Sequence, residues 1–175
     1  MPARVNVAAM KLETVGLDRV DEIVDLVLRC DEEWRPWAPT GWEPPARSRE
    51  RIGWQERLRG VRRHWIRAAM DDGRVVGIVA WRPVVDDDGN PAPKPTGHID
   101  MLFVEPGEWG RGVGRDMLIA SEEAMREAGC TLGRLNVAER NPARAFSEHY
   151  GWSVTGPAEF SPGLQLPLVP YEKRL

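Results

Sequence analysis

The stretch VEPGEWGRGVGRDM at 104–117 constrains the fold of this chain more than any other part of its sequence. The segment before it, 97–104, is rich in apolar and β-favouring residues and predicts a strand that Pro106 ends. Apolar residues at helical spacing over 112–128 predict a long helix that Gly129 stops. Any fold must therefore place a strand, a glycine-rich turn and a helix in direct succession.

This turn has the chemistry of a phosphate cradle. Its glycines allow a tight turn and a close approach of backbone N–H groups to a ligand, and a helix N-terminus favours negative charge. Arg111 and Arg115 add two cations. A Walker A loop is excluded because no lysine is present, and a Rossmann turn is excluded because Met117 stands where its third glycine belongs.

The rest of the chain predicts an α+β protein with a mixed sheet rather than a series of βαβ units. Helices are expected over 17–30, 49–60 and 142–150. Ser48 is the expected cap of the second helix, and Ile52 and Leu58 are available for burial. Strands are expected over 4–10, 64–70, 74–82, 134–137, 152–155 and 164–174. A DDG turn at 71–73 joins two of the strands, and 31–45 and 86–95 are expected loops. With 175 residues, residues 1–175 are expected to form one domain.

Composition excludes several classes of protein. No apolar run is long enough to span a membrane, and the N-terminus has no secretory h-region, so a cytoplasmic protein is expected. Cys30 and Cys130 lie far apart and predict two buried free thiols, while three histidines without an HExxH pattern predict no metal site. A net charge of −3 argues against nucleic acid as a partner. Residues 47–67 nevertheless hold eight arginines and two acids, which predicts either a solvated helix face or a surface for an anionic ligand.

A second motif, LNVAERNPARAFSEHYGW at 135–152, follows the glycine-rich turn. Together the two resemble the GNAT superfamily of acyl-CoA-dependent N-acetyltransferases. The first is similar to that family's [QR]xxGx[GA] loop after a strand ending in V-x-P, and the second to its N-x-x-A-x-x-x-[YF] segment followed by G-[FW]. The order of expected elements matches the family over nearly the whole chain.

The resemblance implies a mixed, mostly antiparallel sheet of about seven strands with about four helices. Two parallel strands would splay apart, with acetyl-CoA as cosubstrate in the gap and no metal. A backbone N–H near Phe103 or Val104 would form an oxyanion hole. The implied cofactor-binding residues are Leu102, Phe103, Val104, Trp109, Gly110, Arg111, Gly112, Val113, Gly114, Arg115, Asn141 and Arg144. Trp109 stands where the family has Gln or Arg, and either covers the cofactor or packs.

Two of these positions have alternatives. Asn141 is also a good helix cap before Pro142, and Arg144 is equally a solvated arginine. Where many members of the family have a tyrosine acid for the leaving thiolate, this chain has Ser147. We expect Ser147 before Tyr150 in a role beside the sulfur, with helix packing as the alternative for both.

The amine must lose a proton before it attacks, so a base or a water relay is expected. His98 and Asp100 share one strand face and are the candidate residues, His98 as base and Asp100 as an attractor of a cationic amine. Glu105 ranks below them. The alternative for His98 and Asp100 is an ordinary polar position near the sheet edge.

The acceptor side is expected at the tryptophan-rich loop. Trp34, Trp37 and Trp42 form either an aromatic lid that clasps an ammonium group or a packing anchor for the loop. The expected function is acetyl transfer to a primary amine of a small molecule, an antibiotic or a metabolite. The alternatives are a protein or peptide N-acetyltransferase and a non-catalytic acyl-CoA-binding module. A homodimer through the strand at 164–174 is also possible for such a fold.

Overall fold

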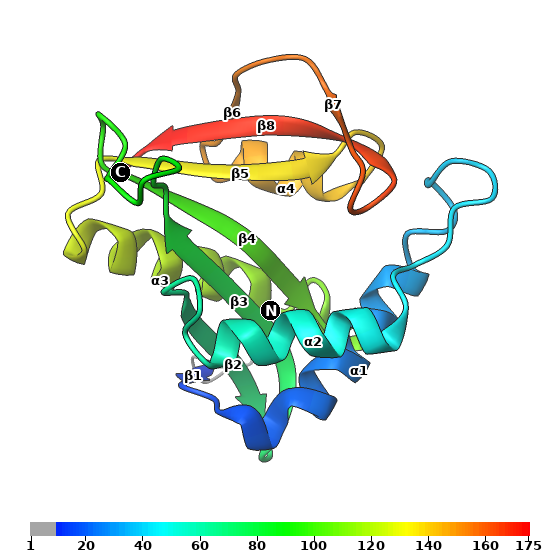
Figure 1. The fold of residues 1–175 in the computed structure, drawn as a ribbon. Helices are drawn as coiled ribbons and strands as arrows, with labels where there is room; N and C mark the ends of the chain where they lie inside the picture. Colours follow the sequence, from blue (N-terminus) through cyan, green and yellow to red (C-terminus); the bar gives the residue numbers. More distant parts are fainter. Residues whose placement is uncertain (1–9) are drawn as a thin grey trace, which may run out of the picture.

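The computed structural model describes residues 10–175, and it confirms an α+β fold around one mixed sheet (Figure 1). The strands are β1 (Lys11–Glu13), β2 (Trp65–Asp71), β3 (Arg74–Pro83), β4 (Thr96–Val104), β5 (Leu132–Ala138), β6 (Ser153–Val154), β7 (Glu159–Ser161) and β8 (Leu166–Arg174). The helices are α1 (Val20–Glu32), α2 (Arg47–Leu58), α3 (Val113–Glu127) and α4 (Ala143–His149), with short 3-10 turns at Leu17–Arg19 and Pro106–Glu108. The strand expected over 4–10 lies outside the described residues except for Met10.

The strand order is β1-β2-β3-β4-β5-β8-β6, and β7 pairs with β8. Every pairing is antiparallel except that of β4 with β5, which is parallel. The expected DDG hairpin joins β2 to β3, with Asp72 and Gly73 both at positive φ. Two antiparallel half-sheets therefore meet at a single parallel junction.

That junction opens along its length. β4 and β5 pair only from Thr96 to Ile99, after which β4 continues along β3 and β5 continues along β8 (Figure 1). A register shift in the β3–β4 ladder pairs Ala80 with Met101 and Trp81 with Ile99, so Asp100 is the extra residue of a bulge. The edge of β4 beyond the bulge is left without a partner strand.

Helices cover both faces of the N-terminal half-sheet. α3 packs on one face through Val113, Met117 and Met125, while α1 and α2 cover the other with Ile23 and the fully buried Trp54. α4 packs against β5 in the C-terminal half. A side chain at Gly97 on β4 would meet Met125 at 2.8 Å, so this glycine lets α3 lie close to the sheet.

Three sequence expectations need correction. Ser48 does not cap α2, because the helix begins at Arg47 and Ala46 holds the cap position without a side-chain bond. Ile52 is 58% exposed, and Trp54 is the residue of α2 that enters the core, with Leu58 partly buried beside it. β7 was not expected, because its three residues give no alternating pattern.

The strand expected to mediate a homodimer is β8, which has β5 along one edge and β6 and β7 along parts of the other. A homodimer through this strand stays a prediction.

Within residues 10–175, both cysteines are buried and free, as expected. No helix in this range is long and apolar enough to cross a membrane. The same residues contain no group of three or more His, Cys, Asp or Glu side chains placed to hold a metal ion.

Candidate active site

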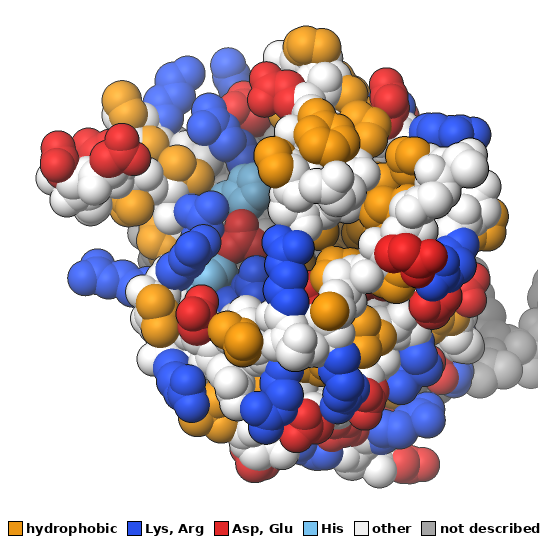
Figure 2. Space-filling view, turned by 45° about the vertical axis from the view of Figure 1, so that its right-hand side comes forward, with side chains coloured by type: hydrophobic (Ala, Val, Ile, Leu, Met, Phe, Trp, Pro, Cys, Tyr) orange, Lys and Arg blue, Asp and Glu red, His pale blue; other side chains and the backbone are white. Residues whose placement is uncertain are grey.

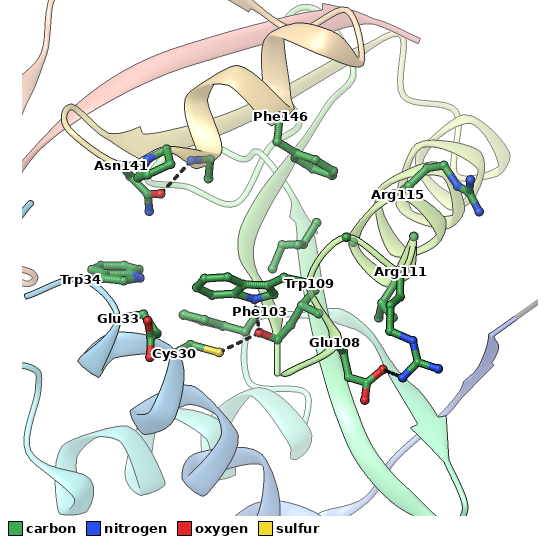
Figure 3. A pocket seen from close by; sticks show the side chains of 18 of the residues that line it. Cys30, Glu33, Trp34, Phe103, Glu108, Trp109, Arg111, Arg115, Asn141 and Phe146 are labelled. Carbon is green, nitrogen blue, oxygen red and sulfur yellow. Dashed lines mark hydrogen bonds and ion pairs between the residues drawn. The ribbon is translucent and has the colours of Figure 1, made fainter. Parts of the chain in front are cut away.

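A cavity of about 870 Å³ lies where β4 and β5 separate (Figure 3). Its walls come from the end of β4, the loop before α3, the start and inner face of α4, and the end of α1 with the loop that follows. The lining residues are Cys30, Glu33, Trp34, Trp37, Leu102, Phe103, Val104, Glu108, Trp109, Gly110, Arg111, Gly112, Val113, Gly114, Arg115, Asn141, Pro142, Ala143, Phe146 and Tyr150. The structure thus brings most of the expected cofactor-binding residues to one place.

The glycine-rich loop presents main-chain N–H groups to this cavity. Gly112 holds the position before α3 with a φ of 89°, a conformation that L side chains rarely adopt. The first bond of the helix runs from the N–H of Asp116 to the carbonyl of Gly112 at 3.0 Å. The N–H groups of residues 113–115 precede it and have no partner within the helix. They form an anion cradle at the helix N-terminus.

The two arginines of the loop are already paired. Arg111 binds Glu108 at 2.6 Å, and Arg115 binds Asp116 at 2.8 Å. Both guanidinium groups remain about half exposed. An anion at this loop would therefore meet main-chain donors first.

The unpaired edge of β4 has a defined orientation. The N–H of Glu105 donates to the carbonyl of Val76 on β3 at 2.8 Å. Because bonded pairs alternate along an antiparallel ladder, the backbone groups of Leu102 and Val104 point away from β3, toward the open edge. The carbonyl of Val104 accepts from Cys30 Sγ at 3.1 Å and from Trp109 Nε1 at 2.8 Å. Trp109 is therefore fixed at this edge with its ring half-exposed in the cavity.

The cysteine in this wall is a donor rather than a nucleophile. Burial raises the pKa of the Cys30 thiol to about 12, and the carboxylates of Glu105 and Asp31 add to the shift. The thiol stays protonated at neutral pH and holds the end of β4 against α1.

The start of α4 contributes Asn141, whose side-chain oxygen accepts from the N–H of Ala143 at 2.8 Å. The capping role considered from the sequence is confirmed, and Asn141 lines the cavity as well. Arg144 does not line it. Arg144 donates to the hydroxyl of Tyr171 at 2.9 Å and to the carbonyl of Glu139 at 3.1 Å, so it braces α4 against β8.

Ser147 was expected before Tyr150 beside the sulfur, but Tyr150 lines the cavity and Ser147 does not. Ser147 is buried, and its hydroxyl donates to the carbonyl of Ala143 at 3.2 Å, one turn back in α4. Tyr150 lines the cavity and packs on Phe146, with ring centroids 4.9 Å apart. The reason is the short α4, which ends at His149 and turns the following tyrosine toward the gap.

The tryptophan-rich loop divides between the two expected roles. Trp34 and Trp37 line the cavity beside Glu33. Trp34 stacks with Phe103, with ring centroids 6.4 Å apart (Figure 3). Trp42 is buried, and its indole N–H donates to the carbonyl of Leu164 at 2.9 Å. Trp42 therefore anchors the loop, while the other two face the space next to the β4 edge.

His98 and Asp100 share one face of β4, as expected, but neither lines the cavity. Asp100 accepts from Arg82 at 3.0 Å and lies 2.6 Å from His64 Nε2. Burial by itself raises the pKa of Asp100, but the bond with His64 and the charge of Arg82 outweigh it and the net shift is downward. Burial lowers the pKa of His98, against the opposing charge of Asp100.

Sequence reasoning missed His64 as a partner of Asp100, whereas Glu33 was among the acids expected to favour a cation beside the tryptophan-rich loop. His64 was placed at the beginning of a strand, and only the tertiary fold brings it to Asp100. Glu33 stands in a run of acids at the end of α1, next to Trp34 in the sequence.

Comparisons with known proteins agree with this geometry. The model of the Acetyltransferase (GNAT) family matches residues 27–152. No curated protein matches the sequence. Among solved structures, the PaiA N-acetyltransferase of Thermoplasma acidophilum, in complex with coenzyme A, has a TM-score of 0.66 at 13% identity and covers 95% of this chain and 99% of its own.

Two further structures have the same fold. YncA of Salmonella typhimurium, a putative acetyltransferase solved with acetyl-CoA, has a TM-score of 0.68 at 17% identity, with 95% of this chain and 94% of its own covered. The ribosomal-protein-alanine N-acetyltransferase of Brucella melitensis has a TM-score of 0.70 at 18% identity, with 95% and 100% covered. Since the family match spans more than half of the sequence, the chain belongs to the GNAT acetyltransferase family, whose reaction is acetyl-CoA-dependent N-acetyl transfer.

Proposed function

We propose that this protein transfers an acetyl group from acetyl-CoA to the primary amine of a small molecule, such as an antibiotic or a metabolite. One observation carries the proposal: a single cavity contains both the N–H cradle of residues 112–115 and, across the open edge of β4, an acidic and aromatic wall of Glu33, Trp34 and Trp37. A thioester carrier and an amine can therefore meet in the same space.

The residues present fit the cosubstrate. The open backbone edge at Leu102 and Val104 suits an extended arm with amide groups, and the cradle at the start of α3 suits a pyrophosphate. Acetyl-CoA supplies the activated acetyl thioester when bound. The N–H of Val104 faces the open edge and is the donor that we assign to the thioester oxygen.

The wall opposite the cradle suits a cationic amine. Glu33 offers a carboxylate, and Trp34 and Trp37 offer ring faces, the combination that attracts an ammonium group. His98 and Asp100 lie outside the cavity, so a proton that either accepts has to travel through water. Tyr150 lies inside and is the residue that we assign to the leaving sulfur.

The acceptor that fits is small. The whole cavity measures about 870 Å³, within the usual range of small-molecule sites, and the cosubstrate arm takes part of it. Trp42 fixes the tryptophan-rich loop beside the mouth through its bond to Leu164.

The test is release of free thiol from acetyl-CoA over a panel of small amines, aminoglycosides, amino acids and peptides at pH 6 to 9. Acceptor-dependent release with small amines supports the proposal. Release only with peptides or proteins would replace the small-molecule acceptor, and tight acetyl-CoA binding without release from any acceptor would favour a binding module.

A further inference from the structure

A second hollow lies on the α2 side of the sheet, where α2 ends and β2 begins. It measures about 90 Å³ and is lined by Gly53, Glu56, Arg57, Arg62 and His64. Figure 2 shows histidine and acidic side chains at the floor of a depression rimmed by Lys and Arg side chains. Neither the cosubstrate cradle nor the tryptophan wall includes any of these five residues.

Two buried side-chain nitrogen atoms of this hollow have no hydrogen-bond partner within residues 10–175. Arg57 Nε and His64 Nδ1 are each buried without a hydrogen bond. The His64 side chain is only 1% exposed, and its other nitrogen is held by Asp100 at 2.6 Å. Buried polar groups are nearly always paired, and one left unpaired destabilises the fold. Arg57 Nε is a donor, and His64 Nδ1 is a donor in the protonated imidazolium, so both nitrogens suit a hydrogen-bond acceptor placed in this hollow.

The charges around the hollow point to an anion. Arg57 and Arg62 form no ion pair within residues 10–175, whereas Arg82 and Arg134 on the neighbouring strands are paired with Asp100 and Glu172. The guanidinium carbon of Arg57 also lies 5.3 Å from the centroid of the Trp54 ring, and this contact holds the guanidinium group in position.

Three carboxylates act on Arg57 and oppose an anion here, namely Asp100, Glu50 and Glu56. Glu50 does not line the hollow. Glu56 is the one carboxylate among the five lining residues, and its residue is exposed. Asp100 lies behind His64 and is already engaged by His64, Arg82 and the nearby His98. Burial lowers the pKa of Arg57, a cost that a bound anion would offset.

We infer that the hollow formed by Arg57, Arg62 and His64 binds an oxyanion, a carboxylate or a phosphate, carried by the acceptor. The inference rests on the proposed function for its link to the acceptor. That link is β4: His64 contacts Asp100, and Leu102 of the cavity follows two residues later, about 7 Å along the strand. The acceptor that we propose therefore has an amine at one end, for the cavity, and an anion at the other, for the hollow.

The binding test uses inorganic phosphate and acetate as probes, each at constant ionic strength with NaCl. The imidazole proton resonances of His64, assigned by loss in His64→Gln, report occupancy by NMR. We expect saturable shifts in the wild type and at least tenfold weaker binding in the Arg57→Gln/Arg62→Gln variant. Arg59→Gln is the matched control, since Arg59 is an exposed arginine of the same segment outside the hollow. Its affinity should stay within twofold of the wild type.

Equal affinities in all variants, or no saturable shift, would overturn the inference. Arg62→Gln alone covers the case in which loss of the half-buried Arg57 disturbs folding, because Arg62 is exposed. It should weaken the probe at least threefold with an unchanged melting temperature. Comparing the two probes tells whether carboxylate or phosphate is preferred.

A kinetic arm connects the hollow to the acceptor. Once an acceptor is known, phosphate or acetate should inhibit competitively against it and non-competitively against acetyl-CoA. Competition against acetyl-CoA would place the ion in the cradle at α3 and overturn the inference. Absence of any acetyl transfer would refute the proposed function, while the NMR arm would still report whether the hollow binds an anion.

Discussion

The cosubstrate side and the acceptor side of this protein are built in different ways. The cosubstrate side comes mostly from one continuous stretch, residues 102–115, and works through main-chain groups. Its cations are neutralised by neighbours, Arg111 by Glu108 and Arg115 by Asp116. The acceptor side that we propose is assembled from α1, the tryptophan-rich loop, α2 and β4. Within residues 10–175, Arg57 Nε and His64 Nδ1 on this side have no hydrogen-bond partner.

This difference has a physical reason. A shared cosubstrate is held by backbone geometry, which glycines and a helix N-terminus provide whatever the neighbouring side chains are. Discrimination between acceptors needs side chains placed for one molecule. Groups without an internal partner are available for that purpose, at a cost in stability.

The largest effect is expected at Asp31 on α1. Asp31 is 3% exposed, and burial, with the charges of Glu50 and Glu32, raises its pKa to about 7. The folded state then holds a proton that the unfolded state has lost, so stability falls as pH rises from about 4 to about 7. Asp31→Asn removes this loss and should stabilise the protein above pH 7 by at most about 4 kcal/mol.

Urea unfolding at pH 5 and pH 8 measures the Asp31 effect. The difference between variant and wild type should grow with pH. Asp25→Asn, an exposed position on the same helix, is the control and should show little pH dependence. A pH-independent difference for Asp31→Asn would mean that this carboxyl group is not destabilised in the fold.

Two substitutions distinguish Tyr150 from Ser147 as the residue that acts on the leaving sulfur. Tyr150→Phe should lower kcat about 100-fold, because general acids contribute at least that much. Ser147→Ala removes only a hydroxyl bonded within α4 and should leave kcat within about twofold. Single-turnover rates at saturating acetyl-CoA give the comparison. A larger loss in Ser147→Ala than in Tyr150→Phe would restore the ranking that the sequence suggested.

The cradle is tested by two glycines at the ends of α3. Gly112 and Gly129 both have positive φ, at 89° and 84°, so alanine strains the backbone similarly at each. Gly112→Ala should raise the Kd of acetyl-CoA about tenfold, while Gly129→Ala should not change it. Calorimetric titration measures both. Equal effects would mean that the loss reflects general stability and not the cradle.

The smallest effect is expected at the tryptophan wall. Trp34→Leu should raise the acceptor KM several-fold and leave the Kd of acetyl-CoA unchanged, since ring–cation contacts contribute about 1 kcal/mol. Trp42→Leu instead removes a buried anchor and should lower the melting temperature. Initial rates and thermal unfolding distinguish them. An unchanged KM in Trp34→Leu would remove this residue from the acceptor site.

The sequence predicted the cosubstrate side well because its information is local. A strand, three closely spaced glycines and a helix appear in order between residues 97 and 128, and all lie where the pattern indicated. The fold class followed from the same order of elements. The bounds of α1 and α2 differed by two or three residues and those of α3 and α4 by one, because caps depend on contacts that the pattern does not contain.

The acceptor side was predicted only in part because its contacts are long-range. His64 reaches Asp100 across 36 positions of sequence, and nothing near either residue indicates the other. The side to which the Tyr150 side chain points depends on the residue at which α4 ends. The apolar periodicity of the sequence does not define that residue closely enough. Trp34 and Trp42 look alike in sequence, and only the fold separates one that faces the cavity from one that packs.

The most direct measurement of the central claim is amide hydrogen exchange with and without coenzyme A. The account predicts slower exchange on addition of coenzyme A at the open edge of β4, residues 101–104, and in the loop 110–115, with no change at residues 57–64. Protection centred on 57–64, or none at 101–104, would contradict the assignment of the splayed strands to the cosubstrate.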